Sequence, residues 1–346
     1  MLRGTVGEAK AVDPGLRVPR TYPPIEELLS EGVVYMEPGD PRIDSALEAE
    51  LGVEEFAGVE VGGEQFILGF NVGRGHHRDD VLLSLGIVRH SINQKLREER
   101  FQDLLRQARE IQASILPKRA PRFWRFKVAG RTEPMDAVGG DFFDLIPITD
   151  RILGLAIADV SGHGLPAALQ VRDIYMGLRM GMARDFKIVR TVERLNGIIH
   201  ESTLTSRFVS MFYGELESTG NFIYVNAGHP PPFHIAADGT VTQLEQGGPV
   251  LGPLPNATYD RGFVHLEPGD LLVLYTDGIV EAPSGAEATL GEEYGLERLQ
   301  QVARANQHRP AREIVDAIFK SVNGWTDGAP LADDQTVLLV LNPVEG

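Results

Sequence analysis

Short apolar runs that end beside an aspartate are the feature that most constrains how this chain can fold. Residues 152–158 and 271–275 have the length and apolar character of buried strands. Asp159 directly follows the first run, and Asp277 comes two residues after the second. An acidic side chain at the end of a buried strand needs a compensating cation, so both positions are candidate metal ligands.

Two further aspartate sites extend this pattern. Asp333 and Asp334 precede the apolar run 336–341, and Asp141 follows two glycines. Each site alone is equally consistent with a simple turn, because Asp and Gly both favour turns. Carboxylates gathered from several strand ends indicate a cation site, and hard oxygen ligands suit Mg²⁺ or Mn²⁺ better than Zn²⁺. The combination predicts a divalent-metal site with phosphate chemistry.

Charge and cysteine content narrow the classes of partner. The chain has 49 acidic against 33 basic residues, a net charge of −16, which disfavours binding to DNA or to an anionic membrane surface. It has no cysteine, which excludes a disulfide framework and a thiol nucleophile and fits a cytoplasmic location. No apolar run approaches the ~20 residues of a spanning helix, and no signal peptide is expected.

The aspartate segments resemble one family, the PPM-type metal-dependent serine/threonine protein phosphatases, in their bacterial SpoIIE/RsbU-like branch. The resemblance runs in order along residues 117–343. It is carried by the segments 139–141 (GGD), 159–164 (DVSGHG), 226–230 (NAGHP), 267–270 (EPGD), 276–278 (TDG) and 333–336 (DDQT).

The resemblance implies two Mn²⁺ or Mg²⁺ ions that activate a water against a phosphoserine or phosphothreonine. Asp159 would bridge the two ions, with the Val160 carbonyl and Asp141 completing one site. Asp277 and Asp333 would hold the other ion. Asp141, Asp159 and Asp277 are thereby the expected catalytic residues, acting through the metals.

Several roles stay open at the level of the sequence. Asp334 either shares or supports the second metal site, and adjacent aspartates are not told apart by sequence. His163 and His229 are candidate general acids, although His163, in a glycine-flanked turn, is also interpreted as a cap or brace of that turn. Eukaryotic members of the family grip phosphate with an arginine near the first carboxylate, whereas here the nearest upstream arginine is Arg131.

The element pattern predicts an α/β fold, a four-layer α-β-β-α sandwich, which is also the fold of the named family. Helices are expected over 165–184, 188–202, 295–305 and 311–323. Hairpin-like strand segments are expected at 222–225 and 232–236, with a turn at Asp238-Gly239 leading into 241–244.

The N-terminal third is expected to be a separate, smaller α/β module. Residues 1–20 form a flexible tail, and 21–78 form a small sensory or dimerisation module with a hairpin around Gly62-Gly63 and a resemblance to the C-terminal half of a GAF domain. Residues 79–116 form a long linker helix. Residues 117–343 form the phosphatase domain.

The linker helix carries two apolar seams whose phases do not match. They are Val81, Leu85, Val88 and Ile92, then Leu104, Ala108, Ile111 and Ile115. Such spacing predicts a coiled coil and a homodimer, against the alternative of a helix packed on its own domain.

The family resemblance further implies a protein substrate, a phosphorylated anti-sigma-factor antagonist in a partner-switching pathway. The alternatives are an inactive scaffold that signals through its N-terminal module, and another two-metal hydrolase such as a nuclease. No nucleic acid or membrane partner is expected.

Overall fold

The computed structural model describes residues 18–44, 46, 55–72, 75–162, 164–182, 187–202, 208–285 and 291–344. The chain divides into two compact units, Met1–Leu104 and Leu105–Gly346. Most of the tail expected at residues 1–20 lies outside the described residues, as does His163. None of the described helices is both long and apolar enough to cross a bilayer.

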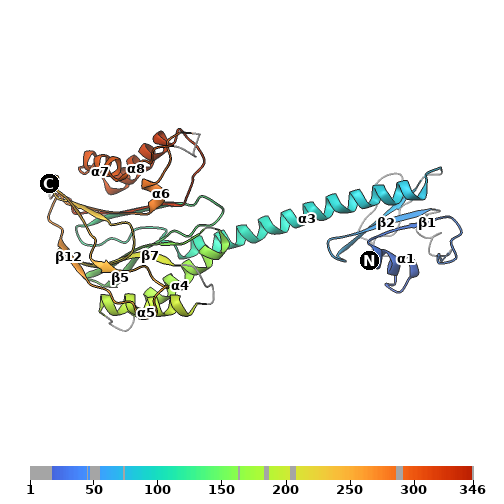
Figure 1. Cartoon of the computed structure of the whole chain (residues 1–346), viewed down its shortest axis with the longest axis horizontal. Helices are drawn as coiled ribbons and strands as arrows, with labels where there is room; N and C mark the ends of the chain where they lie inside the picture. Colours follow the sequence, from blue (N-terminus) through green and yellow to red (C-terminus); the bar gives the residue numbers. More distant parts are fainter. Residues whose placement is uncertain are drawn as a thin grey trace. The chain divides into compact units, whose positions relative to one another are not determined.

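Two sheets form the centre of the larger unit (Figure 1). One has the strand order β10-β9-β13-β14-β4, and the other has the order β11-β8-β7-β6-β5 with β12 also paired to β8. The strands are β4 (Lys127–Glu133), β5 (Phe142–Thr149), β6 (Ile152–Val160), β7 (Val209–Glu217), β8 (Asn221–Ala227), β9 (Phe233–Ile235), β10 (Val241–Gln243), β11 (Gly247–Gly248), β12 (Gly262–His265), β13 (Leu271–Tyr275) and β14 (Gln335–Leu341).

Helices cover the outer face of each sheet (Figure 1). The pair α4 (Leu165–Met182) and α5 (Ile188–Glu201) packs on the β6 sheet, and α7 (Leu296–Ala305) and α8 (Ala311–Trp325) pack on the β13 sheet. A single turn of helix, α6 (Asp277–Val280), follows β13.

Alternation along the strands explains why the layers stack. In β6, Leu155 and Ile157 face the other sheet, whereas Ala156 and Ala158 face the helices. Side chains of a strand point to opposite faces in turn, so a strand that is apolar throughout must be covered on both sides. The expected α-β-β-α sandwich is therefore confirmed.

One detail of the strand expectations is wrong. The segments expected at 222–225 and 232–236 do not pair with each other, because β8 belongs to one sheet and β9 to the other. The chain crosses between the sheets through the bend that begins at Gly228, whose φ is 65°. The hairpin of β9 and β10 around Asp238-Gly239 is confirmed.

The smaller unit is a three-stranded antiparallel sheet with one short helix, α1 (Pro23–Glu31), among its described residues. Its strands β1 (Val33–Met36), β2 (Phe56–Val61) and β3 (Phe66–Asn71) lie in that order, and the β2–β3 hairpin turns at Gly62-Gly63 as expected. The resemblance of this unit to a GAF domain stays a prediction from the sequence.

The long helix expected over 79–116 is present as α3 (Arg78–Ile115). The first expected seam is not free for a partner, because Leu85 is buried in the core of the smaller unit and Val81 and Ile92 pack against that core. Val88 of that seam is exposed, but it lies outside the heptad phase that the other exposed large apolar side chains of α3 share. Those side chains are Leu83, Ile87, Phe101, Leu104 and Ile111.

Candidate functional site

The aspartates predicted from the sequence come together at one end of the two sheets. Asp277 is the first residue of α6, directly beyond β13, and Asp333 and Asp334 lie just before β14. Because β13 and β14 are antiparallel neighbours with Tyr275 opposite Val337, these residues meet at the same sheet end. Asp159, near the end of β6, brings a carboxylate from the other sheet.

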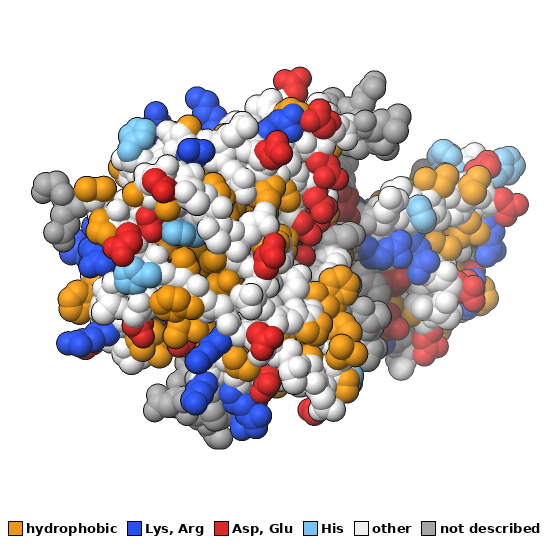
Figure 2. Space-filling model, turned by 60° about the vertical axis from the view of Figure 1, so that its left-hand side comes forward, with side chains coloured by type: hydrophobic (Ala, Val, Ile, Leu, Met, Phe, Trp, Pro, Cys, Tyr) orange, Lys and Arg blue, Asp and Glu red, His pale blue; other side chains and the backbone are white. Residues whose placement is uncertain are grey.

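Electrostatics show how closely these groups interact. Burial, together with the negative charges of Asp277, Asp333, Asp334 and Glu281, raises the pKa of Asp159 to about 7. Burial, followed by the charge of Asp159, raises the pKa of Asp141 well above its ordinary value. A bound cation would offset the repulsion among carboxylates that lie this close together. Figure 2 shows acidic side chains gathered in a band on one face of the larger unit.

The donor set suits Mg²⁺ or Mn²⁺. In the described part of the chain, no three acidic, histidine or cysteine side chains are arranged to enclose an ion together. Mg²⁺ is bound through one or two carboxylates and keeps several waters, so it does not need such a cage. The backbone carbonyl of Val160 is a further oxygen donor and lies close to the segment before Asp141, because a Cβ on Gly140 would lie 2.8 Å from it.

Asp334 differs from its neighbours in that each of its oxygens accepts a hydrogen bond from a backbone amide. Its Oδ1 accepts a hydrogen bond from the Met135 amide at 2.7 Å, and its Oδ2 accepts one from the Gly140 amide at 2.6 Å. A Cβ on Gly139 would lie 2.4 Å from Oδ2, which explains the glycine there. Asp334 thus fixes the loop that leads into Asp141.

Threonines hold Asp141 in place, and the sequence analysis missed them. The Thr276 hydroxyl donates to Asp141 Oδ2 at 2.7 Å and accepts from the Thr336 amide at 2.9 Å. The Thr336 hydroxyl continues the chain by donating to Thr132 at 2.7 Å. The signal was present in the sequence, because Thr276 and Thr336 lie within the motifs that contain Asp277 and Asp333.

Glu281 is a second group that the sequence analysis did not single out. It lies one helical turn after Asp277, and burial and the charges of Asp277, Glu293 and Asp333 raise its pKa. Its backbone amide donates to the Asp277 carbonyl at 2.8 Å. The helical turn of α6 therefore adds another carboxylate to the cluster, which no spacing rule for strand ends would have found.

His229 is a brace and not an acid. Its Nδ1 accepts from the Ser210 hydroxyl at 2.9 Å and its Nε2–H donates to the Tyr275 carbonyl at 3.1 Å. Burial lowers the pKa of His229 to about 3, so the ring is neutral at physiological pH. Both ring nitrogens are thus engaged within the fold, which does not fit the general-acid role considered for this residue.

Arg131 does not face the aspartates. Its guanidinium lies over the Phe319 ring at 4.4 Å and pairs with Glu133 and, at 3.5 Å, with Asp316 on α8. Phe319 and Asp316 belong to the outer helical layer, and Glu133 is the last residue of β4. The nearest upstream arginine in the sequence is therefore engaged elsewhere.

Comparisons with known proteins agree with this geometry. Residues 149–341 match the family model described as Stage II sporulation protein E (SpoIIE). Protein IcfG of Synechocystis is 27% identical over 312 residues, covering 78% of this chain and 47% of IcfG. Phosphoserine phosphatase RsbU of Bacillus subtilis is 28% identical over 271 residues, covering 77% of this chain and 78% of RsbU. The chain thus spans about half the length of IcfG.

Solved structures show the same fold. The PP2C domain of SiaA from Pseudomonas aeruginosa superposes with a TM-score of 0.62 at 20% identity, covering 70% of this chain and 97% of that domain. The PP2C domain of SpoIIE from Bacillus subtilis, with a fragment of its regulatory domain, gives a TM-score of 0.55 at 19% identity, covering 63% and 62%.

Proposed function

This chain belongs to the SpoIIE family, and we propose that it is a metal-dependent phosphatase that hydrolyses phosphoserine or phosphothreonine in a protein. One observation carries the proposal. Carboxylates from both sheets converge at one end of a PP2C-type sandwich, where burial and the charges of the neighbouring aspartates raise the pKa of Asp159 to about 7. The name of the relative RsbU, a phosphoserine phosphatase, supports this substrate class.

We assign the metal ligands as follows. Asp159 would contribute to both metal sites, Asp141 and the Val160 carbonyl would hold one ion, and Asp277 and Asp333 would hold the other. When bound, the two ions supply the Lewis acidity that activates a water and neutralises charge on the phosphate. No side-chain nucleophile is then required.

The remaining residues of the site position these ligands. Thr276 directs Asp141 through its hydroxyl, and Asp334 holds the loop before Asp141 through two backbone amides. His229 ties β7 to the end of β13, two residues before Asp277. A ligand set that is oriented before the metal arrives loses less entropy on binding it.

The substrate we propose is the phosphorylated antagonist of an anti-sigma factor, acting in a partner-switching pathway. This rests on the resemblance to the SpoIIE/RsbU-like branch. A net charge of −16 argues against a nucleic-acid substrate and thus against the alternative of a nuclease. We place the protein in the cytoplasm, because a chain without cysteine suits a reducing compartment.

We further propose a homodimer through α3. The exposed side chains Leu83, Ile87, Phe101, Leu104 and Ile111 lie at a and d positions of one heptad frame. Exposed positions in the middle of the helix are polar in this frame (His90, Gln94, Arg97). A polar segment of this kind weakens a coiled coil locally and leaves it able to adopt more than one packing.

The test is release of phosphate from a phosphoserine protein with Mn²⁺, compared with chelated enzyme. Asp159→Asn and Asp277→Asn should each abolish turnover and leave the circular dichroism spectrum unchanged. Asp150→Asn, at an exposed turn between β5 and β6, is the matched control and should retain full activity. Wild-type turnover in both site variants at saturating Mn²⁺ would remove the site assignment. Absence of any Mn²⁺-dependent turnover in the wild type would favour the scaffold.

A further inference from the structure

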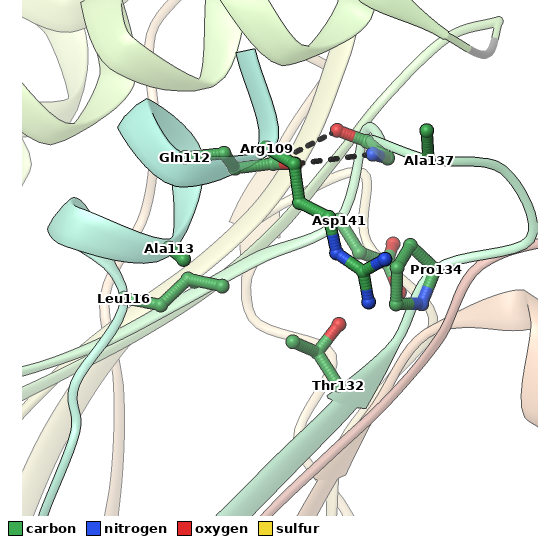
Figure 3. A pocket seen from close by; sticks show the side chains of 9 residues that line it. Arg109, Gln112, Ala113, Leu116, Thr132, Pro134, Ala137 and Asp141 are labelled. Carbon is green, nitrogen blue, oxygen red and sulfur yellow. Dashed lines mark hydrogen bonds between the residues drawn. The ribbon is translucent and has the colours of Figure 1, made fainter. Parts of the chain in front are cut away.

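A cavity of about 150 Å³ lies beside Asp141, between the end of α3 and the loop that precedes β5 (Figure 3). Arg109 on α3, Thr132 on β4, and Pro134 and Ala137 in the loop all line it, together with Asp141. All of these residues belong to the larger unit. The cavity therefore opens a path to a proposed metal ligand from the side of the helix.

Arg109 is the cationic side chain that lines this cavity. Its guanidinium points into the space toward Thr132, Pro134 and Asp141 (Figure 3). The residue is exposed, and within the described ranges it has no ion pair or hydrogen bond to another side chain. Its five N–H donors are thus available to a ligand in the cavity.

The helix that carries Arg109 is fixed to the loop of Asp141. Gln112, one turn after Arg109, is buried, and its Nε2 donates to the Gly139 carbonyl at 2.6 Å. The Gly139 amide donates back to Gln112 Oε1 at 3.2 Å. This reciprocal pair holds the end of α3 against the backbone two residues before Asp141. The position of Arg109 relative to Asp141 is accordingly set by the fold.

Other arginines of the larger unit that could supply charge here are engaged. Arg131 stacks on Phe319, and Arg179 pairs with Asp144 at 2.9 Å and stacks on Tyr175. A phosphate that enters an acidic cluster needs positive charge beyond that of the metal ions, since it brings close to two negative charges of its own. Among the residues that line the cavity, Arg109 can provide it.

We infer that Arg109 binds the phosphate group of the substrate, so that the linker helix supplies the phosphate-binding arginine of this enzyme. The planar guanidinium matches two phosphate oxygens at once, which a lysine ammonium does not. This inference rests on the proposed function, because it names the group that holds the substrate at the same site. It concerns binding and includes no bond-making step.

The experiment measures the affinity of the Mn²⁺-loaded protein for inorganic phosphate by isothermal titration calorimetry. Arg109→Ala should weaken phosphate binding by roughly tenfold or more, as expected for loss of a charge-assisted bidentate contact. Arg109→Lys should recover part of that loss. Arg119→Ala is the matched control, since Arg119 is exposed, lies outside the cavity and should leave phosphate affinity unchanged.

Steady-state kinetics add a second readout. With p-nitrophenyl phosphate, Arg109→Ala should lower kcat/KM and weaken product inhibition by phosphate to the same extent, while the Mn²⁺ concentration for half-activation stays that of the wild type. A shifted Mn²⁺ midpoint with unchanged phosphate affinity would show that Arg109 acts only through the loop, and the inference would be wrong.

Failure of the inference and failure of the proposed function are distinguishable. If the wild type hydrolyses phosphoserine and Arg109→Ala binds phosphate as tightly as the wild type, only the role of Arg109 is overturned. If the wild type hydrolyses nothing but binds phosphate in an Arg109-dependent manner, the function is wrong and the binding site stands. A wild type that binds no phosphate with Mn²⁺ present overturns the inference itself.

Discussion

Replacing Asp334 and replacing Asp159 should change the stability of the metal-free protein in opposite directions. Asp334 accepts hydrogen bonds from two backbone amides, those of Met135 and Gly140. Removing it leaves both donors without a partner. Asp159 instead has a pKa raised to about 7 by burial and by the like charges around it. Neutralising it relieves repulsion.

The stability loss expected on replacing Asp334 can be worked out from its two backbone hydrogen bonds. A hydrogen bond to a charged group contributes about 1.5–3 kcal/mol, so Asp334→Ala should lower the free energy of unfolding by roughly 3–6 kcal/mol. In a unit of this size each kcal/mol shifts the Tm by about 2–4 °C, so the melting temperature should fall by at least roughly 6 °C. Asp334→Asn keeps one acceptor and should lose about half as much.

The assay is urea unfolding with a chelator present at pH 8. The two tryptophans of the chain, Trp124 and Trp325, both belong to the larger unit, so their fluorescence follows its unfolding. Asp159→Asn should raise the urea midpoint under the same conditions. If Asp334→Ala also raises it, Asp334 is one of the repelling metal ligands and its role as a brace is refuted.

Three further outcomes are expected. Because the pKa of His229 is lowered in the folded state, its contribution to stability is complete above about pH 6.5 and is lost as the pH falls toward 3. In urea titrations, the unfolding free energy of the wild type should therefore fall by on the order of 2 kcal/mol between pH 7 and pH 5, a loss that His229→Gln should not show. Gln112→Leu leaves the amide and carbonyl of Gly139 unpaired, which should cost about 1–3 kcal/mol for each buried group and lower the Tm. An unchanged Tm in differential scanning calorimetry would contradict the conclusion that Gln112 anchors α3 to the Gly139 backbone. Replacing Leu104 and Ile111 with Glu should convert the dimer to a monomer in light scattering and change turnover. If the wild type is already a monomer at micromolar concentration, the dimer proposal is wrong and α3 only connects the two units.

The sequence predicted the fold because burial leaves a strong local pattern. Strands that are apolar on both faces, such as β6 and β14, have to be covered on both sides, and this pattern together with the helix spacing predicted the sandwich. Sequence patterns did not reveal that β8 and β9 separate into different sheets. Two adjacent strands with a short bend between them look alike whether they pair or part.

The aspartates could be found from the sequence because an acidic residue beside a buried strand is unusual, but their individual roles could not. Whether Asp334 binds a metal or a backbone amide depends on which loop lies opposite it, and that loop is some 200 positions away in the chain. The same holds for His229, whose partners come from two other strands.

The seams of α3 show the same division between sequence and structure. Their spacing gave the helix, but only packing showed that Leu85 is covered by its own unit while Leu104 is exposed. Arg109 carries no sequence signal at all, because an arginine on a polar helix is usually solvated. Its place beside Asp141 is decided by Gln112 and Gly139, since hydrogen bonds between distant segments determine which side chains share a cavity.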